Sequence, residues 1–271
     1  MPFSFNVLKS QIPSQAPTVF KKLKGILGIQ PKPAGENSYG EHLRGRADET
    51  WPEALNRFES FCRSLHAFYD EEGETYELYF DEYFQDGTLF EWSGAVSDED
   101  LLSAETQHAF AMPEELKALF RKRFAIYDVV ADRGRWGDRR ILEIYGRSTS
   151  TSYPCLHAFC PAIAWNFGEY FAREELTEEQ IAHLSANYFC FGRWSDDDHY
   201  CTYLLVDRHG NYGRFRFRTE DYPGTLQRLE PLLNGQPFDM TLDALLVWAI
   251  NNSMEYLLER NDLPSPYGKE A

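Results

Sequence analysis

The sequence predicts an α+β fold: a largely antiparallel β-sheet with helices packed on one side and at the ends. Short aromatic and apolar runs separated by turns that contain Gly and Asp are typical of antiparallel strands. Longer segments place apolar residues three and four positions apart, as one face of a helix does. The 271-residue chain is 43% hydrophobic and 15% aromatic, so it has enough apolar surface to bury a substantial core.

Three consecutive strands are predicted in the second half of the chain, at residues 188–191, 200–206 and 212–218. The middle run carries no charge, as expected of a strand that is buried on both faces. In the third run, Phe215 alternates with Arg214 and Arg216, which predicts a half-buried strand with a basic face in water. A turn is expected at residues 192–198, and a second at residues 207–211, where Gly210 can adopt a positive φ.

The chain divides into three parts by composition. Residues 1–49 are expected to be loosely structured, because prolines and glycines interrupt them, with a short amphipathic helix possible at residues 19–29. Residues 50–260 are predicted to form the α+β domain, and residues 261–271 a frayed tail.

The first half of the domain is predicted to begin with a helix. Thr50 and Glu53 can form a capping box, and an apolar stripe follows at Trp51, Leu55, Phe58, Cys62, Leu65 and Tyr69. An acidic hairpin comes next, with strands at residues 77–84 and 88–93 on either side of an Asp-Gly turn. The hairpin's aromatic residues include Phe90 and Trp92.

Pro113 then opens a second helix, which leads into strands at residues 124–131 and 140–145. Residues 161–171 are expected to be helical, and the capping box of Thr177 and Gln180 starts the helix before the three strands. The sequence Tyr222-Pro223-Gly224 is expected to interrupt the chain. Thr241 caps the last helix, whose apolar stripe is Leu242, Leu245, Leu246, Ala249, Ile250, Met254, Leu257 and Leu258.

Metal, cofactor and nucleotide sites are not predicted. Adjacent aspartates on a turn point apart and lack EF-hand spacing, and Cys155 and Cys160 lack a partner pair at the usual zinc-ligand spacing. Glycine-rich phosphate loops and nucleophile-elbow motifs are absent from the sequence. The odd number of cysteines, with Cys190 and Cys201 inside predicted strands, suggests core thiols and a reducing compartment.

The stretch from Tyr188 to Arg218 and the helix after it resemble the SUKH superfamily, which includes bacterial toxin-immunity proteins and yeast regulators of cell-wall assembly. The shared pattern is an aromatic-Gly strand, an acidic turn, an apolar strand ending in Val-Asp, a glycine-containing turn and an aromatic strand. The resemblance covers about residues 110–260 and includes the helix that begins Pro-Glu-Glu-Leu-Lys. In the superfamily the acidic turn often carries Gly and Asn, whereas here it is Ser-Asp-Asp-Asp.

This resemblance implies a cytoplasmic immunity protein that binds and occludes a bacterial toxin, and it supplies no catalytic residue. The net charge of −16 disfavours nucleic acid as a partner and suits a basic protein. The longest apolar runs are too short for a membrane helix. Two alternatives remain open from the residues alone: an enzyme of unrecognised type that uses carboxylates in a cleft, and a scaffold or regulator.

Two acidic patches are the candidate partner-binding surfaces. The first is the turn between the first two of the three strands, with the acidic residues Asp196, Asp197 and Asp198 and the flanking aromatics Trp194 and Tyr200. The second is the hairpin, with Asp81, Glu82, Asp86 and Glu91. Because aromatic side chains often anchor protein interfaces, the sequence favours the turn.

Overall fold

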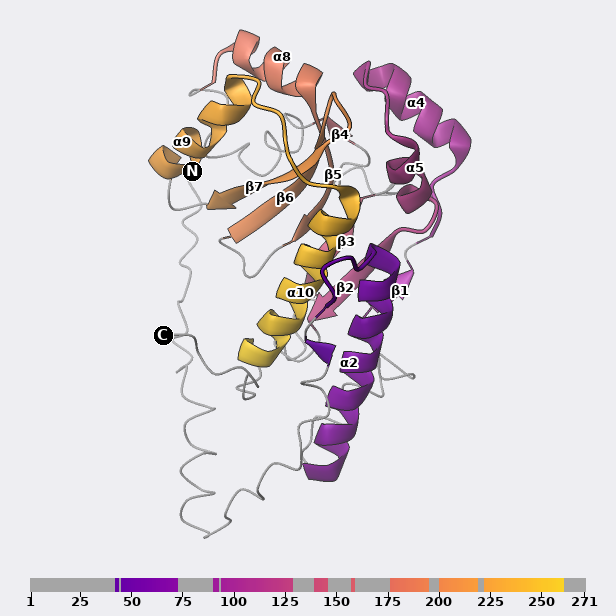
Figure 1. Ribbon diagram of the computed structural model, residues 1–271. Coiled ribbons are helices and arrows are strands. Elements are labelled where there is room, and N and C mark those ends of the chain that lie inside the picture. Colours follow the sequence, from indigo (N-terminus) through magenta and orange to yellow (C-terminus); the bar gives the residue numbers. More distant parts are fainter. Residues whose placement is uncertain are drawn as a thin grey trace, which may run out of the picture. The chain divides into compact units, whose positions relative to one another are not determined.

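The computed structural model describes residues 42–43, 45–72, 90–92, 94–128, 139–145, 157–158, 176–194, 200–218 and 222–260. Within these residues the chain forms six helices and one seven-stranded sheet (Figure 1). All pairings between the strands are antiparallel. The α+β class predicted from the sequence is therefore confirmed. Most of the predicted N-terminal segment, the first strand and turn of the acidic hairpin, the helix at residues 161–171 and the tail lie outside the described residues.

Helices and strands are interspersed along the chain. The helices are α2 (Trp51–Glu72), α4 (Asp98–His108), α5 (Glu114–Phe120), α8 (Glu178–Asn187), α9 (Tyr222–Leu233) and α10 (Leu242–Arg260). The strands are β1 (Phe90–Trp92), β2 (Phe124–Asp128), β3 (Arg139–Ile144), β4 (His157–Ala158), β5 (Tyr188–Trp194), β6 (Tyr200–Asp207) and β7 (Tyr212–Arg218). Their order in the sheet is β1-β2-β3-β5-β6-β7, and β4 also pairs with β5.

The three strands predicted at residues 188–218 are confirmed as the antiparallel series β5, β6 and β7. One boundary was wrong: β5 does not end before Gly192 but continues to Trp194, which pairs with Leu142 of β3. The pairing of β5 with β6 shifts register between Cys190 and Gly192, as at a β-bulge. A Cβ atom on Gly192 would lie 2.6 Å from the backbone oxygen of Glu143, so this glycine permits the close approach of β3.

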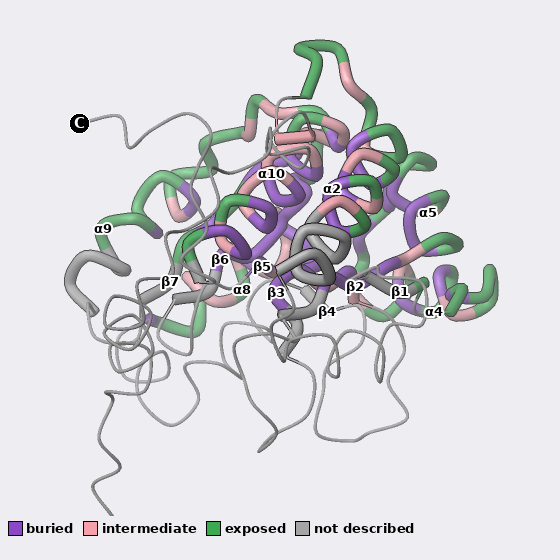
Figure 2. The backbone as a smooth tube through the Cα atoms, turned by 90° about the horizontal axis from the view of Figure 1, so that it is seen from below, coloured by how far each residue is buried: buried purple, intermediate pink, exposed green. Residues whose placement is uncertain are grey.

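Both faces of the sheet are covered, and each has its own core. On one face, α2, α10, α4 and α5 pack against residues such as Phe189, Phe191 and Leu204. On the other face, α8 and α9 pack against Cys190, Tyr203 and other residues of β5–β7. The buried residues follow the sheet and the inner sides of α2 and α10 (Figure 2). The structure thus adds a second helical layer to the one that the sequence predicted.

Helix α10 has the amphipathic character that its sequence predicts. The Thr241 hydroxyl accepts a hydrogen bond from the Ala244 amide at 3.1 Å, so Thr241 caps the helix. Every residue of the predicted apolar stripe is at most 4% exposed. Trp248 faces away from this stripe and is half-buried.

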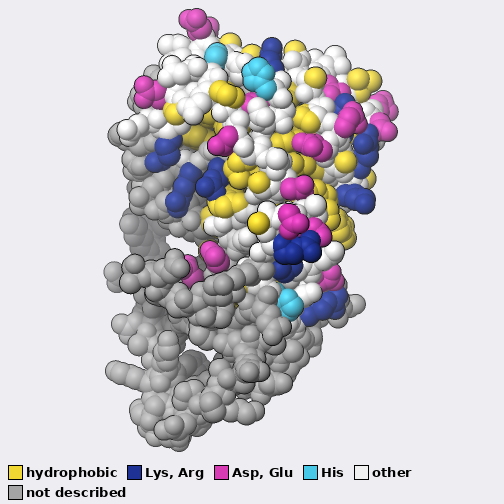
Figure 3. Space-filling view, in the orientation of Figure 1, with side chains coloured by type: hydrophobic (Ala, Val, Ile, Leu, Met, Phe, Trp, Pro, Cys, Tyr) yellow, Lys and Arg dark blue, Asp and Glu magenta, His cyan; other side chains and the backbone are white. Residues whose placement is uncertain are grey.

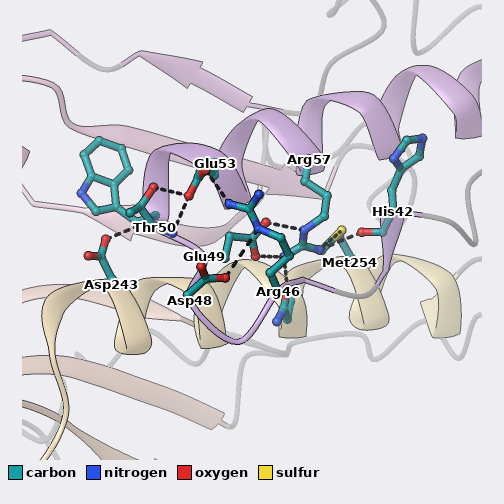
Figure 4. A network of polar contacts seen from close by, with 11 residues as sticks. His42, Arg46, Asp48, Glu49, Thr50, Glu53, Arg57, Asp243 and Met254 are labelled. Carbon is teal, nitrogen blue, oxygen red and sulfur yellow. Dashed lines mark hydrogen bonds and ion pairs between the residues drawn. The ribbon is translucent and has the colours of Figure 1, made fainter.

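A buried ion pair joins α2 to α10 and to the segment before α2 (Figure 4). The Arg57 guanidinium donates to both oxygens of Glu49, at 2.8 and 2.7 Å, and the two side chains are 11% and 6% exposed. The same guanidinium donates to the backbone oxygen of His42 at 2.7 Å and to the side-chain oxygen of Asn251 at 2.6 Å. At the start of α2, the amide of Trp51 donates to the Asp243 carboxylate at 2.8 Å. These contacts fix where α2 begins and how it lies against α10.

The linker between α9 and α10 passes from one face of the sheet to the other beside β7 (Figure 1). On the α9 face, Phe238 lies so close to Gly213 that a Cβ atom there would clash with its ring. At the edge, the backbone groups of Tyr212 and Met240 exchange hydrogen bonds of 2.9 and 3.1 Å. The expected interruption at residues 222–224 was wrong, because these residues begin α9 and Pro223 lies in the first turn, where its missing N–H is harmless.

We expect Leu246→Ala to lower the free energy of unfolding by ~2–5 kcal/mol, because Leu246 is fully buried and its removal leaves a cavity. Urea unfolding followed by circular dichroism measures this change. The neighbouring Val247→Ala is the control, since Val247 is only partly buried. Equal midpoints for Leu246→Ala and wild type would show that α10 does not pack on this side.

We expect Arg57→Ala to cost about 3–5 kcal/mol, because it leaves the buried Glu49 carboxylate without its partner. Arg46→Ala is the matched control: its ion pair with Glu53 is exposed, so its removal should leave the unfolding midpoint close to that of the wild type. Chemical denaturation of both variants in parallel makes the comparison. Similar midpoints for the two variants would contradict the role of the buried pair.

Candidate functional site

Trp194, predicted as an aromatic anchor for a partner, is a core residue. It is 8% exposed, its indole N–H donates to the Ser253 hydroxyl at 3.2 Å, and its ring lies edge-on to Trp248 at 5.8 Å. The reason is the extension of β5, which carries Trp194 under α10 and pairs it with Thr202. The prediction that Trp194 offers its ring to a partner is therefore wrong.

The other predicted contact residues lie outside the described residues, wholly or in their side chains. Tyr200 is the first residue of β6 and pairs with Arg218, but only its backbone is described. Glu91 pairs with Ala125 in the middle of β1, again with only its backbone described. The acidic residues outside the described part are Asp81, Glu82, Asp86, Asp196, Asp197 and Asp198.

Trp92 is the large aromatic side chain that is exposed in the described part of the chain. It ends β1, which is one edge strand of the described sheet, and it is 56% exposed. Its ring meets Phe124 edge-on at 6.3 Å, and Phe124 is stacked on Trp51 of α2 at 5.8 Å. The three rings form a row, which we call the aromatic row, that runs from α2 to the sheet edge. Its inner members are packed, so its outer member is held in place with more than half of its surface in water.

Leu102 of α4 is the second large apolar side chain exposed in the described part of the chain, at 64%. It follows an acidic first turn made of Asp98, Glu99 and Asp100. Asp98 is paired with Arg121 at 2.6 Å, and α4 contains no Phe, Tyr or Trp. A single exposed leucine is common on protein surfaces, so Leu102 serves better as a control than as a site.

Among the described residues, one ion pair most resembles the carboxylate site of an enzyme, and it lies on the α8–α9 face of the sheet. Glu143 of β3 and Arg193 of β5 are neighbours in register, with 3.5 Å between the carboxylate and the guanidinium, and both are largely buried. An ion pair of this kind is more often structural than catalytic. Within the ranges that the structure describes, no cluster of three or more His, Cys, Asp or Glu residues could hold a metal ion.

The described cysteines and helices add two further findings. Cys62 and Cys190 are buried, in agreement with the prediction of a core position for Cys190. None of the helices in the described part is long and apolar enough to cross a membrane.

Comparisons of the chain with models of known families, with curated proteins and with solved structures find no match. The site is therefore interpreted from its own geometry. Among the described residues, the aromatic row that ends in Trp92 is the feature that most resembles an interaction surface. From the sequence alone, Trp92 is expected only to add apolar surface to the predicted hairpin. The signal that could have revealed its exposure is its place at the end of an edge strand, immediately before Ser93 and Gly94.

Proposed function

We propose that this chain is a cytoplasmic immunity protein that binds and occludes a basic bacterial toxin. Two properties of the sequence support a binding role of this kind. The net charge of −16 would steer a basic protein towards the chain. The stretch of residues 188–218 resembles the SUKH superfamily, and it forms a series of three paired strands followed by α9, in the order that the resemblance implies.

The exposed ring of Trp92 is the observation that carries the proposal. Tryptophan is enriched among the residues that dominate binding energy at protein interfaces, where it fills a pocket of the partner. Trp92 is 56% exposed, so a partner can still bury a large apolar area on it. Because Phe124 contacts the ring from inside, Trp92 loses little conformational freedom on binding.

The structure changes which acidic patch is the better candidate. The choice of the Asp196–Asp198 turn depended on Trp194 as a neighbouring anchor, and Trp194 is buried. The acidic stretch that the sequence predicts as a hairpin instead precedes β1 in the chain, where Glu91 comes directly before the exposed Trp92. Acidic residues around an aromatic anchor would speed the encounter with a basic cleft, and the ring would then slow dissociation. We therefore propose β1, together with the acidic residues that precede it in the sequence, as the toxin-binding surface.

The test uses the product of the gene adjacent to the one that encodes this chain, co-expressed in a bacterial host. The wild-type chain should rescue growth and co-purify with that product. Trp92→Ala should weaken binding at least about 30-fold, because an interface anchor of this kind contributes about 2 kcal/mol or more. Calorimetry with the purified proteins measures the change in Kd.

Two further variants make the outcome specific. Leu102→Ala removes the other exposed apolar side chain and should bind as the wild type does. Asp197→Lys combined with Asp198→Lys reverses the charge of the turn and should also leave Kd nearly unchanged. If the wild type neither rescues growth nor co-purifies with the neighbouring product, the immunity function is wrong. If rescue survives Trp92→Ala and fails with the reversed turn, only the location of the surface is wrong.

A further inference from the structure

Asn234 and Gly235 follow the last residue of α9, at the start of the linker to α10, and both are exposed. They form the only Asn-Gly pair in the sequence. An asparagine side chain reacts most readily with the backbone when glycine follows it, because glycine has no Cβ atom to obstruct its amide nitrogen. In Figure 3, backbone and uncharged polar atoms are exposed near the top of the view, where Figure 1 shows this linker. Water therefore has access to the pair.

The backbone at this pair closes α9 in a Schellman motif. Gly235 has a φ of +70°, and its amide donates to the backbone oxygen of Leu232 at 3.0 Å. The amide of Gln236 donates to the backbone oxygen of Pro231 at 2.9 Å, as the motif requires. The last turn of a helix opens at a low cost in free energy. The backbone of Asn234 can therefore rotate until the Gly235 nitrogen faces the Asn234 side chain.

The carbonyl oxygen of Leu232, which accepts the Gly235 amide, is shared with other polar groups. The Tyr188 hydroxyl donates to it at 3.2 Å, and Nε2 of His183 lies 3.3 Å from it. A carbonyl oxygen has two lone pairs, so three polar contacts compete for them. This competition weakens the hydrogen bond of the Gly235 amide, which is the group that must react.

We propose that Asn234 deamidates spontaneously in the folded protein. The Gly235 nitrogen attacks Cγ of Asn234, the new N–Cγ bond closes a succinimide ring, and the Cγ–Nδ2 bond breaks. Ammonia leaves with the proton of the Gly235 amide. Water then opens the ring. Hydrolysis of the N–Cγ bond gives aspartate, whereas hydrolysis of the bond between this nitrogen and the backbone carbonyl carbon gives isoaspartate.

Deamidation would loosen the linker between α9 and α10. Both products place a carboxylate at the C-terminal end of α9, where the helix dipole disfavours negative charge. Isoaspartate also lengthens the backbone by one carbon atom. The backbone oxygen of Gln236 accepts the Tyr188 hydroxyl at 3.0 Å, and the amide of Phe238 donates to Asp207 at 2.9 Å. Because these contacts follow the modified residue closely in the chain, its products should lower stability. The proposal is independent of the toxin-binding surface.

The experiment ages the full chain in mildly alkaline buffer, in which base removes the Gly235 amide proton, in parallel with the same chain in urea. Peptide mapping by mass spectrometry follows Asn234 and separates aspartate from isoaspartate. Deamidation in the folded chain should be at most about tenfold slower than in urea, because the helix end opens easily. Asn252 is the internal control: it precedes Ser253 within α10, and its side chain donates to the backbone oxygen of Trp248 at 2.7 Å. It should react in urea but not in the folded chain.

Asn234→Gln is the matched variant, because the longer glutamine side chain closes the corresponding ring far more slowly. Its urea midpoint should stay constant on ageing, whereas that of the wild type should fall as the deamidated fraction grows. The proposal is overturned if Asn234 stays intact in the folded chain, since the Schellman motif would then protect it. It is also overturned if the aged wild type keeps its midpoint, or if Asn234→Gln loses as much stability on ageing as the wild type does.

Discussion

The carboxylate of Asp207 is the contact on which the arrangement of this fold depends. One of its oxygens accepts the amides of His209 and Asn211, at 2.8 and 2.9 Å, and so closes the turn between β6 and β7. The other accepts the side chain of Asn211 at 3.2 Å and the amide of Phe238 at 2.9 Å. The residue is 3% exposed, so these donors take the place of water. A single buried charge thus joins the central hairpin to the linker between α9 and α10.

The position of that linker determines how both faces of the sheet are covered. Phe238 packs against Tyr188, at 5.3 Å between rings, and closes the core under α8 and α9. Burial, and then the charge of Asp207, raise the pKa of Tyr188, whose hydroxyl donates to the backbone oxygens of Leu232 and Gln236. Two residues beyond Phe238, Met240 pairs with Tyr212, and Thr241 then caps α10 over the other face. The stretch of residues 188–218 is therefore the framework of the fold.

Features that depend on residues close together in the sequence, such as helix caps and tight turns, were predicted correctly. The capping box of Thr177 and Gln180 is present with both of its hydrogen bonds, and Gly210 has a φ of +84° in the turn where a positive value was expected. Helix α4 was not predicted, although Ser97 caps it by accepting the Asp100 amide, because its weak apolar periodicity conceals a helix that is buried only at Leu101 and Ala104.

Features set by contacts distant in sequence could not be predicted in this way. Trp194 looked like a surface aromatic because aspartates follow it, but pairing with β3 and cover from α10 place it in the core. The exposure of Trp92 likewise depends on the end of the sheet and not on its neighbours in sequence. The acidic charge of the candidate surface could therefore be predicted from the sequence. The exposure of its aromatic anchor, Trp92, could be recognised only from the fold.

The most direct test of this account is equilibrium unfolding in urea of Asp207→Ala, compared with Asp239→Ala. We expect Asp207→Ala to lose about 3 kcal/mol or more of unfolding free energy, because buried backbone donors lose a charged acceptor. Asp239 is exposed on the same linker and should be replaced at little cost. Equal stability of the two variants would contradict the central role assigned to the Asp207 carboxylate.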